Sequence, residues 1–175
     1  MGLLSSMPTI GFDSLIQDFL AQKKIAVVGV SRTKPGSASA NYRKLRDSGY
    51  KVYAVNPNTT EFDGDPCYPD LKSIPDSVDG VLIFTNPTNA EKIVRECVEL
   101  KIPRVWMHCA LGPNPKFFRE AAAKIGSASD EAVRLCHENN IAVIPGACPM
   151  MYYKDADGFH AFMRRMLHAM GHFSN

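Results

Sequence analysis

The sequence has little excess charge, no long apolar run and no closely paired cysteines. Its 175 residues carry 20 Lys and Arg against 18 Asp and Glu, a formal net charge of +2, far from the basic excess typical of nucleic-acid-binding proteins. No stretch approaches the ~20 apolar residues that cross a bilayer, and the start of the chain lacks the basic and apolar parts of a signal peptide. We therefore expect a cytoplasmic protein with no nucleic-acid partner and no membrane span.

Three further features of the sequence argue against a membrane anchor, a disulfide framework and a metal site. Met1, Gly2 and Ser6 match the loose N-myristoylation pattern, but no second anchor follows, and one acyl chain holds a membrane only marginally. The five cysteines are odd in number and contain no C-x-x-C pair, which is typical of a reducing compartment. His168 and His172 are four residues apart without a third ligand nearby, so we expect no metal.

Short apolar runs alternate with helix-like segments along the chain. The runs are residues 25–30, 51–55, 80–84, 104–107 and 141–144. Helical patterns lie between them at 38–48, 89–100 and 129–139, the last with a cap expected at Ser127 or Ser129. Several runs are apolar throughout, as in parallel strands covered on both faces. The sequence therefore predicts a doubly wound, Rossmann-like α/β fold with a five-stranded, mainly parallel sheet.

The predicted domain occupies residues 23–153. A segment at 1–22 precedes it and contains an amphipathic helix, residues 113–126 form an insertion with a helix at 116–124, and a helix at 154–175 follows. The last helix has one apolar stripe: Phe159, Phe162, Met163, Met166, Leu167 and Met170. We expect this stripe to pack on the same domain, and it is also compatible with a contact in a homo-oligomer.

The loop after the first strand has the chemistry of an anion site. Gly29 lets the backbone approach a phosphate, Ser31 can donate a hydrogen bond, and the next helix presents unpaired N–H groups. The loop lacks the full G-x-G-x-x-G fingerprint, so a plain strand-to-helix turn capped by serine stays open as an alternative.

The end of the second strand distinguishes between nucleotides. An NAD enzyme places Asp or Glu here, whereas this chain has Asn56, Pro57 and Thr59. Arg32 and Lys34 lie in the first loop, so a ligand with several phosphates fits better than NAD, while NADP stays open. The neighbouring basic pair, residues 43 and 44, is expected on a solvated helix face.

Six motifs in order and spacing resemble one known family. They are residues 26–32, 49–57, 64–71, 81–87, 105–108 and 146–149. Together they look like the small stand-alone coenzyme A-binding proteins, which are similar to the Rossmann-like nucleotide-binding domain of the succinyl-CoA synthetase α subunit. The resemblance covers about residues 23–153.

The resemblance implies a non-covalent site for coenzyme A or a short acyl-CoA, with a role for each matching segment. Its phosphate-contacting loop matches Gly29, Val30, Ser31 and Arg32, and Ser37, further along the same loop, is a further candidate contact. The segment beside the adenosine matches Asn56, Pro57 and Thr59, and the third-strand turn under the coenzyme matches Thr85, Asn86 and Pro87. We expect Trp106 to support this crevice from the core.

The sequence departs from the family pattern in ways that bear on activity. Trp106, Met107 and His108 stand where relatives commonly have Trp-x-Gln, and residues 113–126 are added. Acyl-CoA-forming relatives also need a phosphohistidine domain and an ATP-grasp partner, for which this chain has no room. We therefore expect no ligase activity from this chain alone.

An enzyme acting on acyl-CoA thioesters is the leading alternative. His108 and Cys148 both lie at strand ends, where a histidine base could activate a thiol. Neither belongs to a recognised catalytic motif, so a hydrogen-bonded histidine and a packed cysteine are the simpler interpretation. An NADP-binding oxidoreductase is the third hypothesis.

Overall fold

The five predicted apolar runs are strands of one sheet in the computed structural model, which describes residues 11–34, 36–109 and 126–170. The strands are β1 (Lys24–Val28), β2 (Lys51–Val55), β5 (Gly80–Ile83), β6 (Arg104–Met107) and β7 (Ala142–Pro145). All of them pair in parallel with their neighbours. This arrangement confirms the α/β, Rossmann-like, mostly parallel architecture.

The predicted strand count was wrong, because the sheet in the described residues has seven strands in the order β3-β4-β2-β1-β5-β6-β7. The two extra strands, β3 (Glu61–Phe62) and β4 (Asp65–Tyr68), form a small hairpin beyond β2. Asp63 and Gly64 have φ angles of 57° and 86°, the left-handed pair that two-residue hairpin turns favour. Neither strand contains an apolar run, so apolar pattern could not reveal them, although the Asp-Gly pair is a turn signal.

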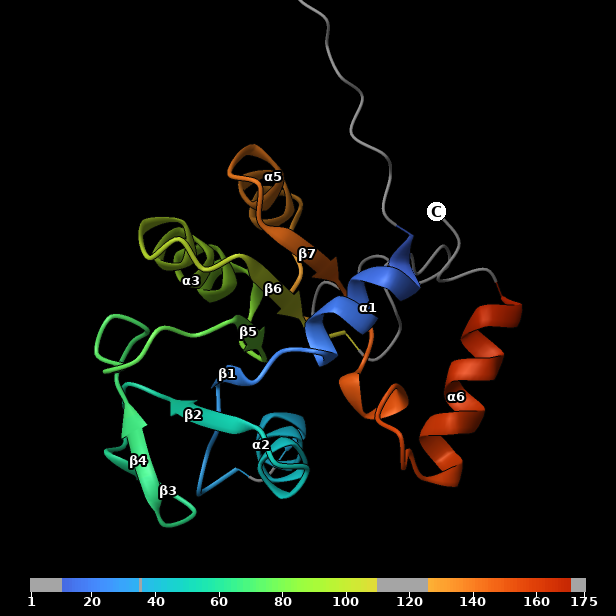
Figure 1. The fold of residues 1–175 in the computed structure, drawn as a ribbon, viewed down its shortest axis with the longest axis horizontal. Helices are drawn as coiled ribbons and strands as arrows, with labels where there is room; N and C mark the ends of the chain where they lie inside the picture. The colour runs from blue at the N-terminus through green and yellow to red at the C-terminus, as the bar shows by residue number, and fades with distance from the viewer. Residues whose placement is uncertain (1–10, 35, 110–125, 171–175) are drawn as a thin grey trace, which may run out of the picture.

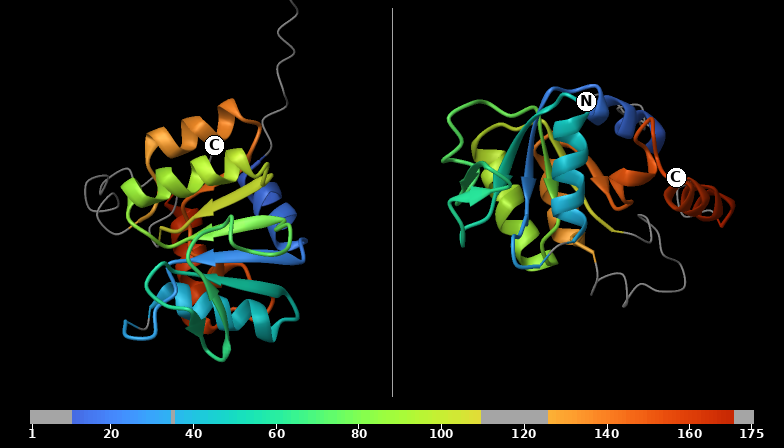
Figure 2. Two further views of the ribbon diagram at one scale, coloured as in Figure 1. Left: turned by 90° about the vertical axis from the view of Figure 1, so that its left-hand side faces the viewer. Right: turned by 90° about the horizontal axis from the view of Figure 1, so that it is seen from below.

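Helices cover both faces of the sheet (Figure 1). They are α1 (Phe12–Leu20), α2 (Ser37–Asp47), α3 (Pro87–Glu99), α5 (Asp130–Glu138) and α6 (Gly158–Ala169), with a short 3-10 helix, η1 (Pro149–Met151). Ile25 and Val27 of β1 pack with α1 and α2, whereas Ala26 and Val28 pack with α3 and α5. Successive strand residues point to opposite faces, so an entirely apolar strand builds two cores at once. Figure 2 shows the helices on the two sides of the sheet.

The helices begin where the sequence offers caps. Ser129 accepts a hydrogen bond from the backbone N–H of Ala132 at 3.0 Å, which selects Ser129 over Ser127 as the cap of α5. Asn86 caps α3 in the same way. The predicted inserted helix at 116–124 lies outside the described residues.

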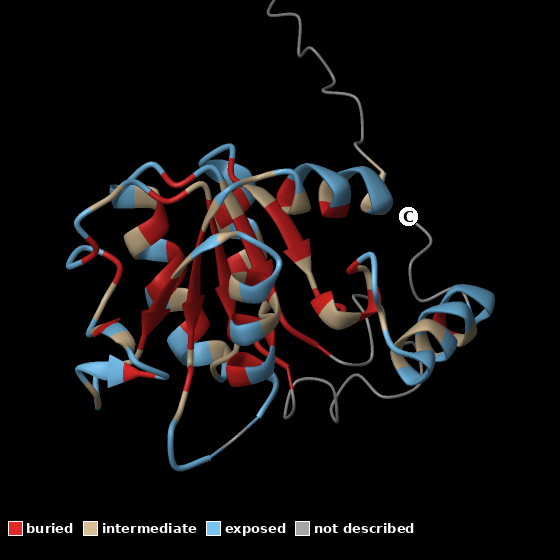
Figure 3. Ribbon diagram, turned by 60° about the horizontal axis from the view of Figure 1, so that its bottom comes forward, coloured by how far each residue is buried: buried red, intermediate tan, exposed pale blue. Residues whose placement is uncertain are grey.

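The apolar stripe of α6 is only partly buried (Figure 3). Leu167 is in the core, with Met163 and Met166 packed beside it. Phe159 and Phe162 are 67% and 62% exposed, and Met170 is also exposed, so the expectation that the whole stripe packs on the domain was wrong for these three side chains. The reason is geometric: α6 meets the body chiefly at η1 and does not lie flat on the sheet.

The part of the chain that the structure describes contains no helix long and apolar enough to cross a membrane.

Candidate functional site

The strand order reverses at β1, which lies between β2 and β5. The backbone N–H of Gly29 donates to the carbonyl of Val55 at 3.0 Å, and that of Phe84 donates to the carbonyl of Val28 at 3.0 Å. The ends of three strands are thereby held side by side at one edge of the sheet. In open parallel sheets ligands bind at this kind of switch point, outside the carboxyl ends of the strands.

Gly29 provides a close backbone approach at the end of β1. Its φ is +103°, a conformation that side chains avoid. A Cβ atom added here would lie 3.2 Å from the carbonyl oxygen of Phe84. The position therefore suits glycine alone and leaves the backbone of the loop open to a ligand.

The rest of the first loop is held by serine hydroxyls. Ser39 Oγ donates to the carbonyl of Ser31 at 3.1 Å and accepts from the Ser31 N–H at 3.3 Å. Ser31 Oγ in turn accepts from the Lys34 N–H at 3.1 Å. The Ser31 side chain thus shapes the loop itself, and the buried Ser39, which sequence reasoning missed, fixes its base.

Helix α2 begins beside this loop without a side-chain cap. Its N-cap is Gly36, and the exposed Ser37 is its first residue. The first N–H groups of an uncapped helix point outward and carry part of the positive end of the helix dipole. Arg32 is exposed and forms no ion pair with any residue of the described segments. A positive, hydrogen-bond-donating surface results at the start of α2.

Asn56 ties the second loop to the first. Its Nδ2 donates to the carbonyl of Val30 at 2.5 Å, and its Oδ1 accepts from the N–H of Asn58 at 2.8 Å. Thr59 Oγ1 donates to the carbonyl of Glu61 at 2.8 Å, while Pro57 is exposed. The Asn56 side chain is therefore occupied by hydrogen bonds to the backbone of Val30 and Asn58. The exposed surface of this loop begins at Pro57.

The third segment, at the end of β5, opens α3. Asn86 Oδ1 accepts from the N–H of Asn89 at 2.9 Å, and Pro87 occupies the first turn. The half-buried Thr85 donates from Oγ1 to the carbonyl of Asn86 at 3.3 Å. Small polar groups therefore line this strand end too, next to Gly29.

A buried polar cluster lies behind α2. Asn41 is fully buried, its Nδ2 donates to the carbonyl of Ser37 at 2.8 Å, and its Oδ1 accepts from Tyr153 Oη at 2.9 Å. The Asn41 side chain also lies close enough to the Cys148 thiol to oppose the rise of its pKa on burial. Sequence reasoning missed this cluster. The signal that could have revealed it was Asn41, an amide on the face of α2 that packs against the sheet.

The two candidate catalytic residues, His108 and Cys148, share no hydrogen bond in the described structure. His108 is buried beside Phe84, with ring centroids 4.8 Å apart, and desolvation lowers its pKa to about 4. Burial raises the pKa of the Cys148 thiol. Both groups are therefore held in their neutral forms at pH 7.

Three neighbouring predictions have clear outcomes. Arg43 is exposed, as expected for a solvated helix face, and pairs with Asp63 at 2.9 Å, whereas Lys44 is half-buried and pairs with Asp155. Trp106 is fully buried and donates from Nε1 to the carbonyl of Gly146 at 2.8 Å, which confirms a supporting place in the core.

Known proteins similar to this chain fall into two groups. The ADP-forming acetate–CoA ligase I of Archaeoglobus fulgidus is 37% identical over 75 residues, which cover 43% of this chain but only 11% of that protein. The uncharacterized protein YneT of Bacillus subtilis is 26% identical over 126 residues, 72% of this chain and 82% of that one. The solved structure of a hypothetical protein from Pyrococcus horikoshii shares the fold, with a TM-score of 0.67 and 24% identity over 86% of this chain and 94% of that chain.

The family assignment rests on a sequence model that matches well over half of the chain. The sequence model of the CoA binding domain family matches residues 23–154, which include β1 to β7 and all three loops of the candidate site. The chain therefore belongs to the CoA binding domain family.

Proposed function

We propose that this protein binds coenzyme A, or a short acyl-CoA, non-covalently at the carboxyl ends of β1, β2 and β5. The main support is the combination of Gly29, which has no room for a side chain, with the uncapped start of α2 beside it. Backbone N–H groups at a glycine turn and a helix start are the usual donors to a pyrophosphate. When bound, coenzyme A supplies a thiol that carries acyl groups.

The first loop supplies the phosphate contacts in this proposal. Val30 and Ser37 offer backbone N–H groups, Gly29 lets the ligand come close to the backbone, and Ser31 shapes the turn between them. Arg32 adds an exposed cation whose planar guanidinium suits phosphate oxygens. We assign recognition of the phosphates to this loop and to the first turn of α2.

The other two strand ends select the rest of the ligand. Asn56, Pro57 and Thr59 lie on the adenosine side, where no acidic residue follows β2 until Glu61. The absence of a carboxylate there disfavours NAD, whose ribose hydroxyls need an acceptor, and tolerates an additional phosphate. Thr85, Asn86 and Pro87 line the path toward the thiol end.

The thioester-processing alternative has less support. A nucleophilic cysteine needs a lowered thiol pKa and a base in hydrogen-bond contact, whereas burial raises the pKa of Cys148 and the side chain close to its thiol is that of Asn41. We therefore favour a binding function, and we propose no ligase activity because the matched region is a small part of the ligase.

Calorimetric titration with coenzyme A, NAD and NADP tests the proposal. We expect coenzyme A to bind with one-to-one stoichiometry and at least tenfold more tightly than either dinucleotide. Arg32→Glu should weaken coenzyme A binding at least tenfold, because it replaces a phosphate partner with a like charge.

Lys101→Glu is the matched control. It makes the same charge change at an exposed residue after α3, at the opposite edge of the sheet, and should leave binding unchanged. Equal binding of the three nucleotides, or equal effects of the two substitutions, would reject the proposed site. Release of free thiol from acyl-CoAs, lost in His108→Ala, would favour the enzyme alternative instead.

A further inference from the structure

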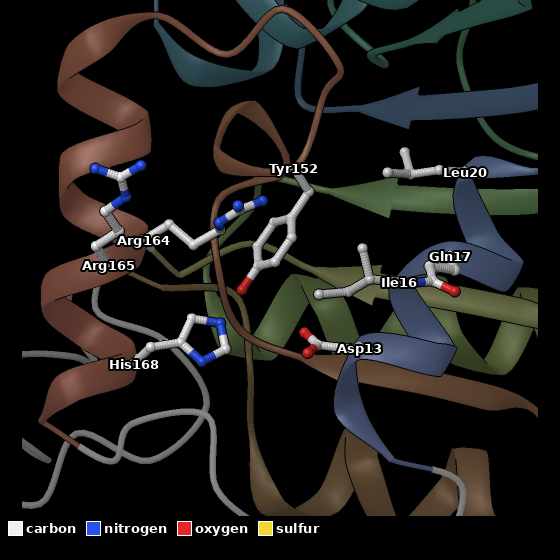
Figure 4. A pocket seen from close by; sticks show the side chains of 8 residues that line it. All are labelled: Asp13, Ile16, Gln17, Leu20, Tyr152, Arg164, Arg165 and His168. Carbon is white, nitrogen blue, oxygen red and sulfur yellow. The ribbon is translucent and has the colours of Figure 1, made fainter.

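A second cleft lies between α1 and α6, and it shares no residue with the proposed coenzyme site. Its volume is about 480 Å³, within the range of small-molecule pockets. Figure 4 shows its two walls: side chains of α1 face side chains of α6 across Tyr152. The cleft therefore has the size and the concave form of a ligand site.

The floor and part of one wall of the cleft are apolar, although Asp13 and Gln17 also line the α1 wall. Ile16 and Leu20 line it from α1, and the ring of Tyr152 lies between the two helices. Tyr152 is itself backed by Trp106, with ring centroids 6.1 Å apart. This side of the cleft suits a hydrocarbon chain.

The opposite wall is cationic. Arg164 extends from α6 over the ring of Tyr152, with its guanidinium carbon 5.7 Å from the ring centroid, and Arg165 also lines the cleft. Neither arginine forms an ion pair within residues 11–34, 36–109 and 126–170. The planar guanidinium of Arg164 is held in place by the ring and can donate hydrogen bonds to both oxygens of a carboxylate.

The acidic side chain of the cleft limits the charge of its ligand. Asp13 faces this space from α1, opposite His168 on α6. Arg164 and Arg165 together with Asp13 leave one positive charge in the lining, which a singly charged head group neutralises, whereas a doubly charged head group meets more repulsion from Asp13. We propose that this cleft binds a monocarboxylate with an apolar tail, its head on Arg164 and its tail against Ile16 and Leu20.

Titration of the whole protein with sodium octanoate tests the inference. Methyl NMR on a sample labelled at isoleucine and leucine methyls should show saturable shifts of the Ile16 and Leu20 signals. Uncharged 1-octanol should bind at least tenfold more weakly, because it lacks the charge-assisted hydrogen bonds. Octyl phosphate distinguishes the head groups, and tighter binding of the phosphate would overturn the assignment to a carboxylate.

Arg164→Met removes the charge and retains an unbranched side chain, and it should weaken octanoate binding at least tenfold. Arg95→Met, at an exposed arginine of α3 on the other face of the sheet, is the control and should have no effect. Saturating coenzyme A should leave octanoate binding unchanged, so failure here is separate from failure of the coenzyme site. Unshifted Ile16 and Leu20 signals, or unaltered affinity in Arg164→Met, would overturn the inference.

Discussion

Gly29 shows how a single residue can prepare a binding surface. Its φ of +103° and the 3.2 Å distance from a built Cβ to the Phe84 carbonyl oxygen exclude a side chain for two separate reasons. Gly64 has a similar φ of +86°, but a Cβ added there has nothing within 4 Å. Both positions therefore carry backbone strain for a side chain, whereas only Gly29 also has a close neighbouring atom, so substitutions at the two glycines distinguish the two effects.

We predict that Gly29→Ala destabilises the protein by about 1–3 kcal/mol through backbone strain, with a further loss from contact with Phe84. It should also weaken coenzyme A binding, because the loop must move to accommodate the methyl group. Gly64→Ala should show comparable strain and normal binding. Chemical denaturation and calorimetric titration of both variants measure these effects, and unchanged coenzyme A affinity in Gly29→Ala would contradict the proposed contact.

Among the elements, α3 begins at a residue that both caps the helix and belongs to the candidate coenzyme site. Asn86 caps the helix through the N–H of Asn89, and Pro87 at the first turn favours the helical backbone. Asn86 also stands at the strand end proposed to contact the coenzyme. Two substitutions separate the cap from the site, since aspartate caps a helix as well as asparagine does.

We predict that Asn86→Ala lowers the free energy of unfolding by about 1 kcal/mol, the usual effect of losing an N-cap. Asn86→Asp should retain the stability but weaken coenzyme A binding, because it adds a negative charge on the path of the anionic coenzyme, at the strand end next to the Gly29 loop. Urea unfolding and calorimetry are the measurements. Normal coenzyme A affinity in Asn86→Asp would place the ligand away from the start of α3.

The stability of the whole molecule should depend on pH through His108. Burial lowers its pKa to about 4 in the folded protein, against an ordinary value of 6.5. Between these values the unfolded chain binds more protons than the folded one, so stability rises with pH. This contribution is fully present above pH 6.5 and decreases as the pH falls toward 4.

We therefore predict a loss of about 2 kcal/mol in unfolding free energy between pH 7 and pH 5 from this group alone. His108→Gln has no titrating group and should flatten the profile over that interval, even where its overall stability is lower. Denaturation at a series of pH values gives both slopes. Parallel profiles would show that His108 titrates normally in the folded protein.

The fold was largely predictable, and its exceptions have physical reasons. The five long strands and their helices follow from apolar runs, because burial on both faces leaves a strong sequence pattern. The hairpin β3–β4 leaves no such pattern, since its strands are short and polar. The exposed Phe159 and Phe162 show that apolar residues at helical spacing predict a helix, but not how much of its apolar face is buried by the rest of the protein.

The strand ends that line the candidate site were also predictable, but the partners of their side chains were not. Glycine, amide and hydroxyl residues after successive strands must meet at one edge of a parallel sheet. Spacing could not indicate that the Asn56 amide holds the Val30 carbonyl, or that Ser39 holds the base of the first loop. Those hydrogen bonds join two segments of the chain, and the distance between these segments is set only when the loops have folded.

The sequence by itself determined the order of the five apolar strands and of the helices between them, the edge where the first, second and third loops meet, and the lack of an acidic group directly after β2. These properties are local, or follow from the geometry of parallel strands. Only the tertiary structure decided the neutral His108, the closeness of Cys148 to Asn41 and the cleft between α1 and α6. Desolvation, hydrogen-bond partners and cavities depend on contacts between distant residues, and those contacts exist only after the layers have packed.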